Sequence, residues 1–147
     1  MPDPDSQLFD YLPHRPPMLL LNRMLAVGDN FSRAEVNIQL DSPFIIGDKG
    51  VPAWVGIEYM GQTAALIAGH QQRQQKLAKH MGFLLGTRRY KTTVHWFTIG
   101  SQLVVECNQA AVVGESLATF DCKITDKQHN AVLATARLSV FRKPVVA

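Results

Sequence analysis

Glu58 is the residue of this sequence whose position most needs a chemical explanation. It falls about six residues into a helical pattern that runs from residue 53 to about 75 and is the most apolar stretch of the chain. By their spacing, Trp54, Val55 and Gln62 share its side of that helix. An ionised carboxylate in apolar surroundings is costly unless it is protonated or hydrogen-bonded. Such surroundings favour the neutral carboxyl that a general acid needs, so Glu58 is predicted to be an acid–base group.

Glu58 also has structural explanations. Its side chain could pair with an arginine such as Arg23 or Arg88, or it could reach the surface. Gln62, one helical turn later, could orient the carboxyl group, although an amide at this position would equally fit a polar core residue with no catalytic role. The residue types alone leave these alternatives open.

The elements that must position this helix are mostly strands. Apolar–polar alternation at 31–40 is typical of a half-buried strand, and the segment 18–28 precedes it across a turn. A short helix capped by Ser6 is predicted to end at Leu12, before Pro13. After an irregular crossing at 41–52 and the long helix, further strands are predicted at 82–94, 101–113, 116–126 and 131–143.

These patterns predict one α+β domain over residues 1–147, an antiparallel β-sheet wrapped around one long central α-helix. Small residues on the helix would let the sheet approach it closely, namely Gly56, Gly61, Ala64, Ala65 and Gly69. Glycine and proline mark turns, but no long linker, repeat or low-complexity tract divides the chain. A chain of 147 residues can bury a core large enough to fold unaided.

The composition is that of a globular protein, with 46% hydrophobic and 18% charged residues. No apolar run reaches the roughly 18 residues that a membrane span needs. The acidic N-terminus carries no export signal, so a cytoplasmic protein is expected. Cys107 and Cys122 lie in predicted strands and fit small buried thiols better than a disulfide or a metal pair. Neither a metal-ligand cluster nor a nucleotide-binding loop is present in the sequence, so no bound metal or cofactor is expected.

The formal charge of +3 is distributed unevenly, because acidic residues favour the first sixty positions. Basic residues gather in the second half, namely Arg88, Arg89, Lys91, Arg137, Arg142 and Lys143. This bias suits an acidic partner, either a protein or a phosphate-bearing group, and it equally suits ordinary solvated strand ends. Nucleic-acid binding is disfavoured, because the sequence has no reader motif and no interleaving of aromatic and basic residues.

Two separated motifs resemble those of the 3-hydroxyacyl-acyl carrier protein dehydratases of the FabZ and FabA type, members of the hotdog superfamily. The first is LPHRPPMLLLNRM at 12–24, which matches the family pattern L-P-H-R-x-P-x-L-L-x-D-R except that Asn22 replaces the aspartate. The second is PAWVGIEYMGQ at 52–62, which matches P-G-x-x-x-x-E-x-x-x-Q except that Ala53 replaces the glycine. The order of elements agrees from about residue 7 to 143, and the resemblance implies a hotdog fold.

One departure from the family pattern concerns the catalytic histidine. In these dehydratases a G-H-F-P-G segment supplies it shortly before the helix. Here the matching loop is I-G-D-K-G-V-P, which is about four residues shorter and has Asp48 where the histidine would fall. This shortened loop, with V-P-A-W ahead of the I-E-Y-M helix, more closely resembles the ApeP-like dehydratase subunit of aryl polyene pigment gene clusters.

The resemblance implies the removal of water from 3-hydroxyacyl thioesters on acyl carrier protein, giving trans-2-enoyl thioesters. Such a reaction needs a base for the α-proton, an acid for the β-hydroxyl and donors for the thioester oxygen. The resemblance assigns Glu58 to acid–base work at the hydroxyl, and N–H groups near Ala53 and Trp54 suit the developing oxyanion. Gln62 and Asp48 complete the predicted substrate-binding residues. The candidates for docking the acidic carrier protein are Arg88, Arg89 and Lys91.

The base is the open assignment. His14 is the best histidine because it lies in the first motif, but in the related dehydratases this position is not the principal catalytic histidine. A structural role, in which it bonds the backbone near the dimer edge, explains it at least as well. Asp48 could contribute a carboxylate, or it could simply form a turn. The remaining histidines lie in positions that suit a base less well, namely His70, His80, His95 and His129.

A partner chain could instead supply the base. The resemblance implies an active site at a subunit interface, with the histidine and the carboxylate coming from different chains. A homodimer is the default, and a heterodimer with a histidine-bearing relative is the alternative. Two other functions stay open: an acyl thioesterase on the same fold, and a non-catalytic subunit of an active dehydratase. In each case the only expected group beyond the protein is the pantetheine arm of the substrate.

Overall fold

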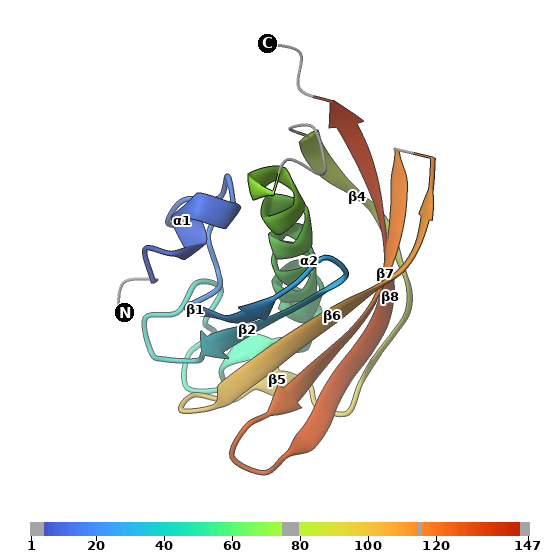
Figure 1. The fold of residues 1–147 in the computed structure, drawn as a ribbon. Helices are drawn as coiled ribbons and strands as arrows, with labels where there is room; N and C mark the ends of the chain where they lie inside the picture. Colours follow the sequence, from blue (N-terminus) through green and yellow to red (C-terminus); the bar gives the residue numbers. More distant parts are fainter. Residues whose placement is uncertain (1–4, 75–79, 115, 145–147) are drawn as a thin grey trace.

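The computed structural model describes residues 5–74, 80–114 and 116–144, and their side chains apart from 80–85, 88 and 142–144. Figure 1 shows a long helix, α2, beside a curved sheet, with the short helix α1 next to α2. The elements in chain order are α1 (Leu8–Tyr11), β1 (Arg23–Val27), β2 (Phe31–Asn37), β3 (Val51–Pro52), the 3-10 turn η1 (Ala53–Val55), α2 (Gly56–Arg73), β4 (His80–Thr92), β5 (Trp96–Phe97), β6 (Gln102–Val113), β7 (Leu117–Asp126) and β8 (Ala131–Pro144).

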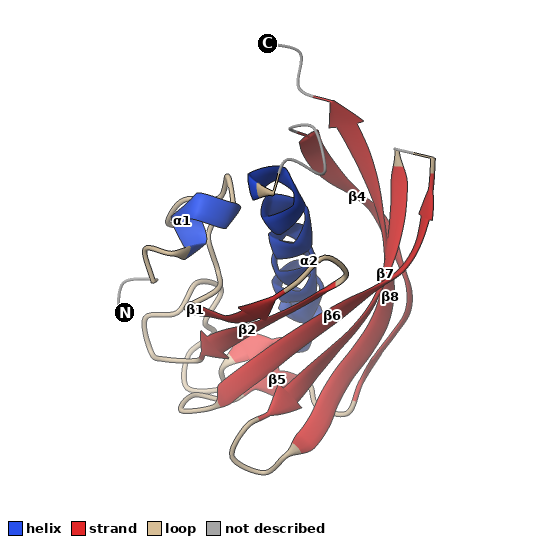
Figure 2. Cartoon of the chain, viewed as in Figure 1, coloured by secondary structure: helices blue, strands red, loops and turns tan. Residues whose placement is uncertain are grey.

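A six-stranded antiparallel sheet in the order β1-β2-β6-β7-β8-β4 wraps around α2 (Figure 2). The pairing of β2 with β6 shows how alternation builds its inner face. Ala34 lies opposite Val105 and Val36 lies opposite Leu103, and all of these side chains are buried. A separate two-stranded ribbon of β3 and β5 lies where the helix begins, because β3 runs directly into η1. The predicted α+β arrangement is confirmed.

The inner stripe of α2 lies in the middle of the hydrophobic core. Met60, Ala64 and Ile67 recur at helical spacing, and each is buried. Cys107 and Cys122 lie opposite each other on β6 and β7, and both are buried free thiols, as predicted. Among the residues that the structure describes, no helix is both long and apolar enough to cross a membrane.

Several local predictions were wrong in detail. Ser6 does not cap α1; instead Asp5 accepts the Gln7 N–H through Oδ1 and the Leu8 N–H through its carbonyl. The strand predicted at 18–28 shortens to β1, because residues 18–22 run irregularly over α2. The β3–β5 ribbon was not predicted, since strands of two residues carry no periodic signal.

The glycines of α2 differ in what surrounds them. A Cβ on Gly69 would lie 2.2 Å from the carbonyl oxygen of Tyr11, and one on Gly56 would lie 2.4 Å from the hydroxyl of Tyr90. A Cβ on Gly61 would have no atom within 4 Å among the described residues. The predicted close packing is therefore confirmed for Gly56 and Gly69, whereas Gly61 lies on an open side of the helix.

Gly69→Ala and Gly61→Ala are expected to change stability in opposite directions. At position 69 the methyl group meets the backbone of α1, so we expect the free energy of unfolding to fall by about 1–3 kcal/mol. At position 61 the methyl group meets nothing, so the better helix propensity of alanine should raise it by about 0.5–1 kcal/mol. Urea titration of both variants measures the two shifts. A stabilised Gly69→Ala would contradict the contact between α1 and α2.

Candidate active site

The loop that carries His14 owes its shape to Arg15. Arg15 Nη1 donates to the carbonyl oxygens of Leu12 and His14, at 2.8 Å each, and Nη2 donates to that of Phe9 at 3.3 Å. The guanidinium also lies 4.6 Å from the centroid of the Phe9 ring. Arg15 therefore closes the C-terminal end of α1 and fixes the backbone of His14. This structural role of the motif arginine was not predicted from the sequence, since nothing in its spacing pointed to the carbonyls of α1.

Gln62 joins this loop to α2. Its side chain is buried, and its Oε1 accepts the Leu20 N–H at 2.9 Å. Its Nε2 donates to the Met18 carbonyl at 2.8 Å and to Glu58 Oε1 at 3.2 Å. One amide thereby holds residues 18–20 against the helix and contacts the carboxylate one turn earlier. If Gln62 orients the Glu58 carboxylate, as one interpretation of the sequence proposes, the two side chains must be hydrogen-bonded in this way.

Glu58 is exposed in the single chain. The expectation of a carboxylate buried among apolar groups is therefore wrong for an isolated protomer, and Trp54, one turn earlier, is exposed as well. Arg23 does not pair with Glu58, because it forms an ion pair with Glu35 at 3.1 Å. The side chain of Arg88 lies outside the described ones. A carboxylate exposed on an otherwise apolar helix is open to a substrate or to a partner chain.

His14 lies close enough to Glu58 for the carboxylate to act on its charge. Burial lowers the pKa of His14 below 6.5, and the negative charge of Glu58 opposes this shift. The Nδ1 atom of His14 is buried and has no hydrogen-bond partner among the described residues. The fold thus brings together, within one chain, the histidine and the carboxylate that the two motifs contribute. The lowered pKa of His14 favours the unprotonated imidazole, which is the state that a base requires.

The η1 turn before α2 offers fewer donors than predicted. Ala53 N–H donates to the carbonyl of His95 at 3.0 Å, so the prediction that it is free for an oxyanion is wrong. The Ala53 carbonyl accepts a hydrogen bond from the Tyr90 hydroxyl. Burial raises the pKa of Tyr90 to about 12, so this hydroxyl stays protonated and keeps its donor role. Of the two predicted oxyanion donors, only Trp54 N–H remains.

The contacts of the described residues do not connect Asp48 to His14 or Glu58. Asp48 is exposed in the turn between Ile46 and Gly50, which form an isolated bridge. The turn-forming interpretation therefore has structural support, and the substrate-binding one has none. Two of the other histidines pair with carboxylates elsewhere, His70 with Asp29 and His129 with Asp126.

Large apolar side chains are exposed around the same end of α2. Met18 is 66% exposed, Trp54 63% and Phe44 50%. The rings of Phe44 and Trp54 meet edge to face, with centroids 5.9 Å apart. Sequence analysis named Trp54 and missed Met18 and Phe44, because exposure cannot be read from apolar letters in irregular segments. Large exposed apolar groups beside a polar pair are typical of a ligand site or a subunit contact.

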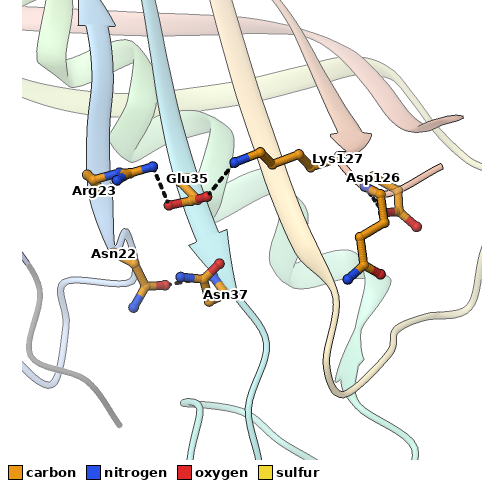
Figure 3. Close-up of polar contacts among 7 residues, drawn as sticks. Asn22, Arg23, Glu35, Asn37, Asp126 and Lys127 are labelled. Atoms are coloured by element: carbon orange, nitrogen blue, oxygen red, sulfur yellow. Dashed lines mark hydrogen bonds and ion pairs between the residues drawn. The ribbon is translucent and has the colours of Figure 1, made fainter. Parts of the chain in front are cut away.

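The outer face of the sheet is basic. Arg23 and Lys127 both form ion pairs with Glu35, at 3.1 and 3.5 Å (Figure 3). Farther along the sheet, a groove of about 790 Å³ has Arg89, Lys91, Lys123 and Arg137 in its lining. Two of the three predicted docking residues, Arg89 and Lys91, therefore share one groove, and Arg88 is not among the side chains described.

A single long helix wrapped by an antiparallel sheet defines a hotdog protein, and solved structures with this fold are similar to the chain. The dehydratase heterocomplex ApeI:P from Xenorhabdus doucetiae superposes with a TM-score of 0.84 at 33% identity, covering 92% of this chain and 90% of that one. A hypothetical thioesterase with coenzyme A from Streptococcus pneumoniae TIGR4 gives a TM-score of 0.65 at 11% identity, covering 84% and 87%. The second likeness shows the fold alone.

The sequence comparisons identify the family within this fold. A family model named ApeP-like and described as ApeP dehydratase matches residues 6–147. The 3-hydroxyacyl-[acyl-carrier-protein] dehydratase FabZ of Polynucleobacter necessarius subsp. necessarius (strain STIR1) is 30% identical over 105 residues, 68% of each chain. The chain belongs to the ApeP-like family of dehydratases. The resemblance to hotdog dehydratases, and to their ApeP-like branch, is thereby confirmed.

Proposed function

We propose that the protein dehydrates 3-hydroxyacyl thioesters carried on acyl carrier protein, giving trans-2-enoyl thioesters for fatty-acid or aryl polyene synthesis. The observation that carries this proposal is the buried Gln62 amide, which bonds the Glu58 carboxylate and the backbone of residues 18 and 20. Arg15 bonds the backbone of His14, and the charge of Glu58 acts on the pKa of that histidine. The name of one relative supports the reaction, since that protein is a 3-hydroxyacyl-[acyl-carrier-protein] dehydratase.

In this reaction His14 removes the α-proton of the thioester, and the C–H electrons form the new double bond as the C–O bond breaks. Glu58 gives a proton to the departing β-hydroxyl, which leaves as water. Trp54 N–H, the next donor of the η1 turn, would face the thioester oxygen as it gains charge. Closing the site over the pair would exclude water and would favour the unprotonated His14 that the reaction requires.

The exposure of Glu58 favours an assembled site. A second chain over this end of α2 would exclude water from the carboxylate and cover the apolar side chains around it. In the sheet order β4 is an edge strand, which could pair with another chain. The Xenorhabdus relative is titled a heterocomplex, which supports a dimer with a related subunit as the alternative to a homodimer.

The same exposure favours one rival, a subunit that shapes the site of an active partner without doing chemistry itself. The lack of a G-H-F-P-G segment points the same way. The thioesterase rival has weaker support, because the thioesterase structure shares only the fold.

Dehydration of a 3-hydroxyacyl carrier protein by the purified protein tests the proposal, with the enoyl product followed by mass spectrometry and free thiol measured in parallel. The assay is run with the protein alone and with a related dehydratase subunit that has the G-H-F-P-G histidine. We expect enoyl product in at least one arm and loss of that product when Glu58 is replaced. Free thiol without enoyl product would mean a thioesterase. Activity with the partner that survives replacement of Glu58 would mean a non-catalytic subunit.

Charge reversal of Arg89 and Lys91 together is expected to raise KM for the carrier-linked substrate by about tenfold, because both cations line the outer groove and would meet an acidic carrier. Turnover of the matching N-acetylcysteamine thioester, which has no carrier protein, should not change. Arg73→Glu, on the last turn of α2, is the control for a charge reversal outside the groove. An unchanged KM for the carrier-linked substrate would place carrier docking elsewhere.

A further inference from the structure

We propose that Tyr90 is a positioning residue for the dehydration, whose hydroxyl fixes the peptide group that presents the Trp54 N–H to the thioester oxygen. This inference rests on the proposed function and adds to it a residue outside both sequence motifs. Tyr90 lies on β4, and its hydroxyl donates a hydrogen bond to the carbonyl oxygen of Ala53, 37 positions earlier in the chain. That carbonyl and the Trp54 N–H belong to one peptide group, so the hydrogen bond acts directly on the group that carries the donor.

The planarity of the peptide group connects the two ends of this contact. In a trans peptide the C=O and the N–H point in opposite directions within one plane. A donor that holds the Ala53 oxygen therefore also sets the direction of the Trp54 N–H. A hydrogen bond accepted by the carbonyl polarises the peptide group as well, which makes its N–H a stronger donor. Tyr90 thus acts on both the orientation and the strength of the N–H that would face the substrate.

Backbone hydrogen bonds hold the same turn on its other sides. The Gly56 N–H donates to the Ala53 carbonyl, and the Ala53 N–H donates to the His95 carbonyl at 3.0 Å. These bonds connect η1 to the helix that follows it and to the residue ahead of β5. Tyr90 adds a side-chain hydrogen bond from β4, which a substitution can remove without altering the backbone.

The space beside Gly56 admits the Tyr90 hydroxyl. A Cβ on Gly56 would lie nearest to that hydroxyl oxygen, at 2.4 Å. The next nearest atoms would belong to Ile124 and Phe97, at 3.0 and 3.1 Å. Glycine is a poorer helix former than alanine, yet it occupies the first turn of α2. The side chains that pack over this position explain the glycine, and the closest of them is the one that bonds Ala53.

The hydroxyl and the ring of Tyr90 have separable roles. The ring packs against the core, so a purely structural role would depend on the ring. Burial raises the pKa of the hydroxyl to about 12, so it stays protonated and remains a donor at any pH suited to an assay. Phenylalanine keeps the ring and removes the hydroxyl, so Tyr90→Phe tests the positioning role by itself.

The first test is the turnover of Tyr90→Phe with a 3-hydroxyacyl carrier protein, in whichever form of the protein is active, alone or with its partner subunit. We expect kcat to fall by about fivefold to fiftyfold, which is less than the loss of a complete oxyanion donor because the Trp54 N–H is still present. KM should stay within about twofold, since the oxygen gains its charge in the chemical step. The pH dependence of kcat/KM should not move, because His14 and Glu58 are unchanged.

Tyr11→Phe is the matched control, because it removes a hydroxyl from α1 and keeps the ring, whose centroid lies 5.1 Å from the Arg73 guanidinium. It should leave kcat and KM unchanged. A Tyr90→Phe variant with the wild-type kcat would overturn the proposal, whatever its unfolding temperature. A rise in KM without a fall in kcat would overturn it too, because the hydroxyl would then contribute to ground-state binding alone.

An infrared measurement separates this inference from the proposed function. The probe is butyryl pantetheine with carbon-13 at the thioester carbonyl, which has no β-hydroxyl and cannot be dehydrated. Its carbonyl band should move to lower wavenumber on binding to the wild type, because an N–H donor weakens the C=O bond, and Tyr90→Phe should reduce that displacement.

The infrared and turnover results can fail independently of each other. A displacement that Tyr90→Phe reduces, in a protein that forms no enoyl product, would reject the proposed reaction and keep the role of Tyr90 toward the donor. Enoyl product together with an equal displacement in both proteins, or with none in the wild type, would keep the reaction and overturn this inference.

Discussion

Glu58→Gln is expected to lower kcat for dehydration by about 100-fold to 10,000-fold, the range for losing a positioned acid–base group. The amide is nearly isosteric and can still accept the hydrogen bond from Gln62 Nε2, so the geometry of the site should persist. It cannot give a proton to the departing hydroxyl. Steady-state assays with a 3-hydroxyacyl carrier protein measure the effect, and KM should change little because the substitution acts on the chemical step.

The control for Glu58→Gln is Glu106→Gln, which removes a carboxylate from the outer face of the sheet instead. Glu106 forms ion pairs with Arg33 at 3.8 Å and Lys123 at 3.3 Å and lines the outer groove, so its loss should change KM for the carrier-linked substrate and leave kcat unchanged. Both variants should unfold at nearly the wild-type temperature. If Glu58→Gln kept full activity with its fold intact, the carboxylate would have no catalytic role, and the non-catalytic subunit would become the better account.

His14→Ala is expected to lower kcat by a similar factor, about 100-fold to 10,000-fold, because it removes the group placed to take the α-proton. His95→Ala is the matched control. The His95 side chain is exposed, and its backbone carbonyl accepts the Ala53 N–H, a contact that alanine preserves. If His14→Ala lost stability but kept its activity, the histidine would be structural and the base would have to come from a partner chain.

The pH dependence separates these two roles of His14. Burial lowers its pKa below 6.5, so the acidic limb of the kcat/KM profile, which reports the free protein, should lie below pH 6.5, where the imidazole takes up a proton. The free energy of unfolding should also fall as the pH is lowered. As pH falls below 6.5 the unfolded chain binds a proton more readily than the folded one, so the folded state loses stability until its own lowered pKa is passed. The His14→Ala variant should lack both effects.

The sequence by itself determined the architecture and the polar residues of the site. Alternation predicted a strand at 31–40 and a further strand was predicted at 101–113, where the structure has β2 and β6. The apolar spacing from Met60 to Ile67 predicted the buried stripe of α2. These elements could be predicted because their periodicity records which side faces the core. Glu58 and Gln62 were recognised for a similar reason, since polar groups are rare in so apolar a helix, and the spacing of the motif placed them one turn apart.

Only the tertiary structure decided which of these residues are exposed to solvent and which of them contact each other. The packing of residues 18–20 against α2 depends on the Gln62 amide bonding Met18 and Leu20, contacts between residues more than 40 positions apart. The exposure of Glu58 follows from the one side of α2 that the sheet does not cover. Periodicity reports the environment of a residue along its own element. The distance between two elements, and the gap they leave open, depend on how side chains from distant parts of the chain pack.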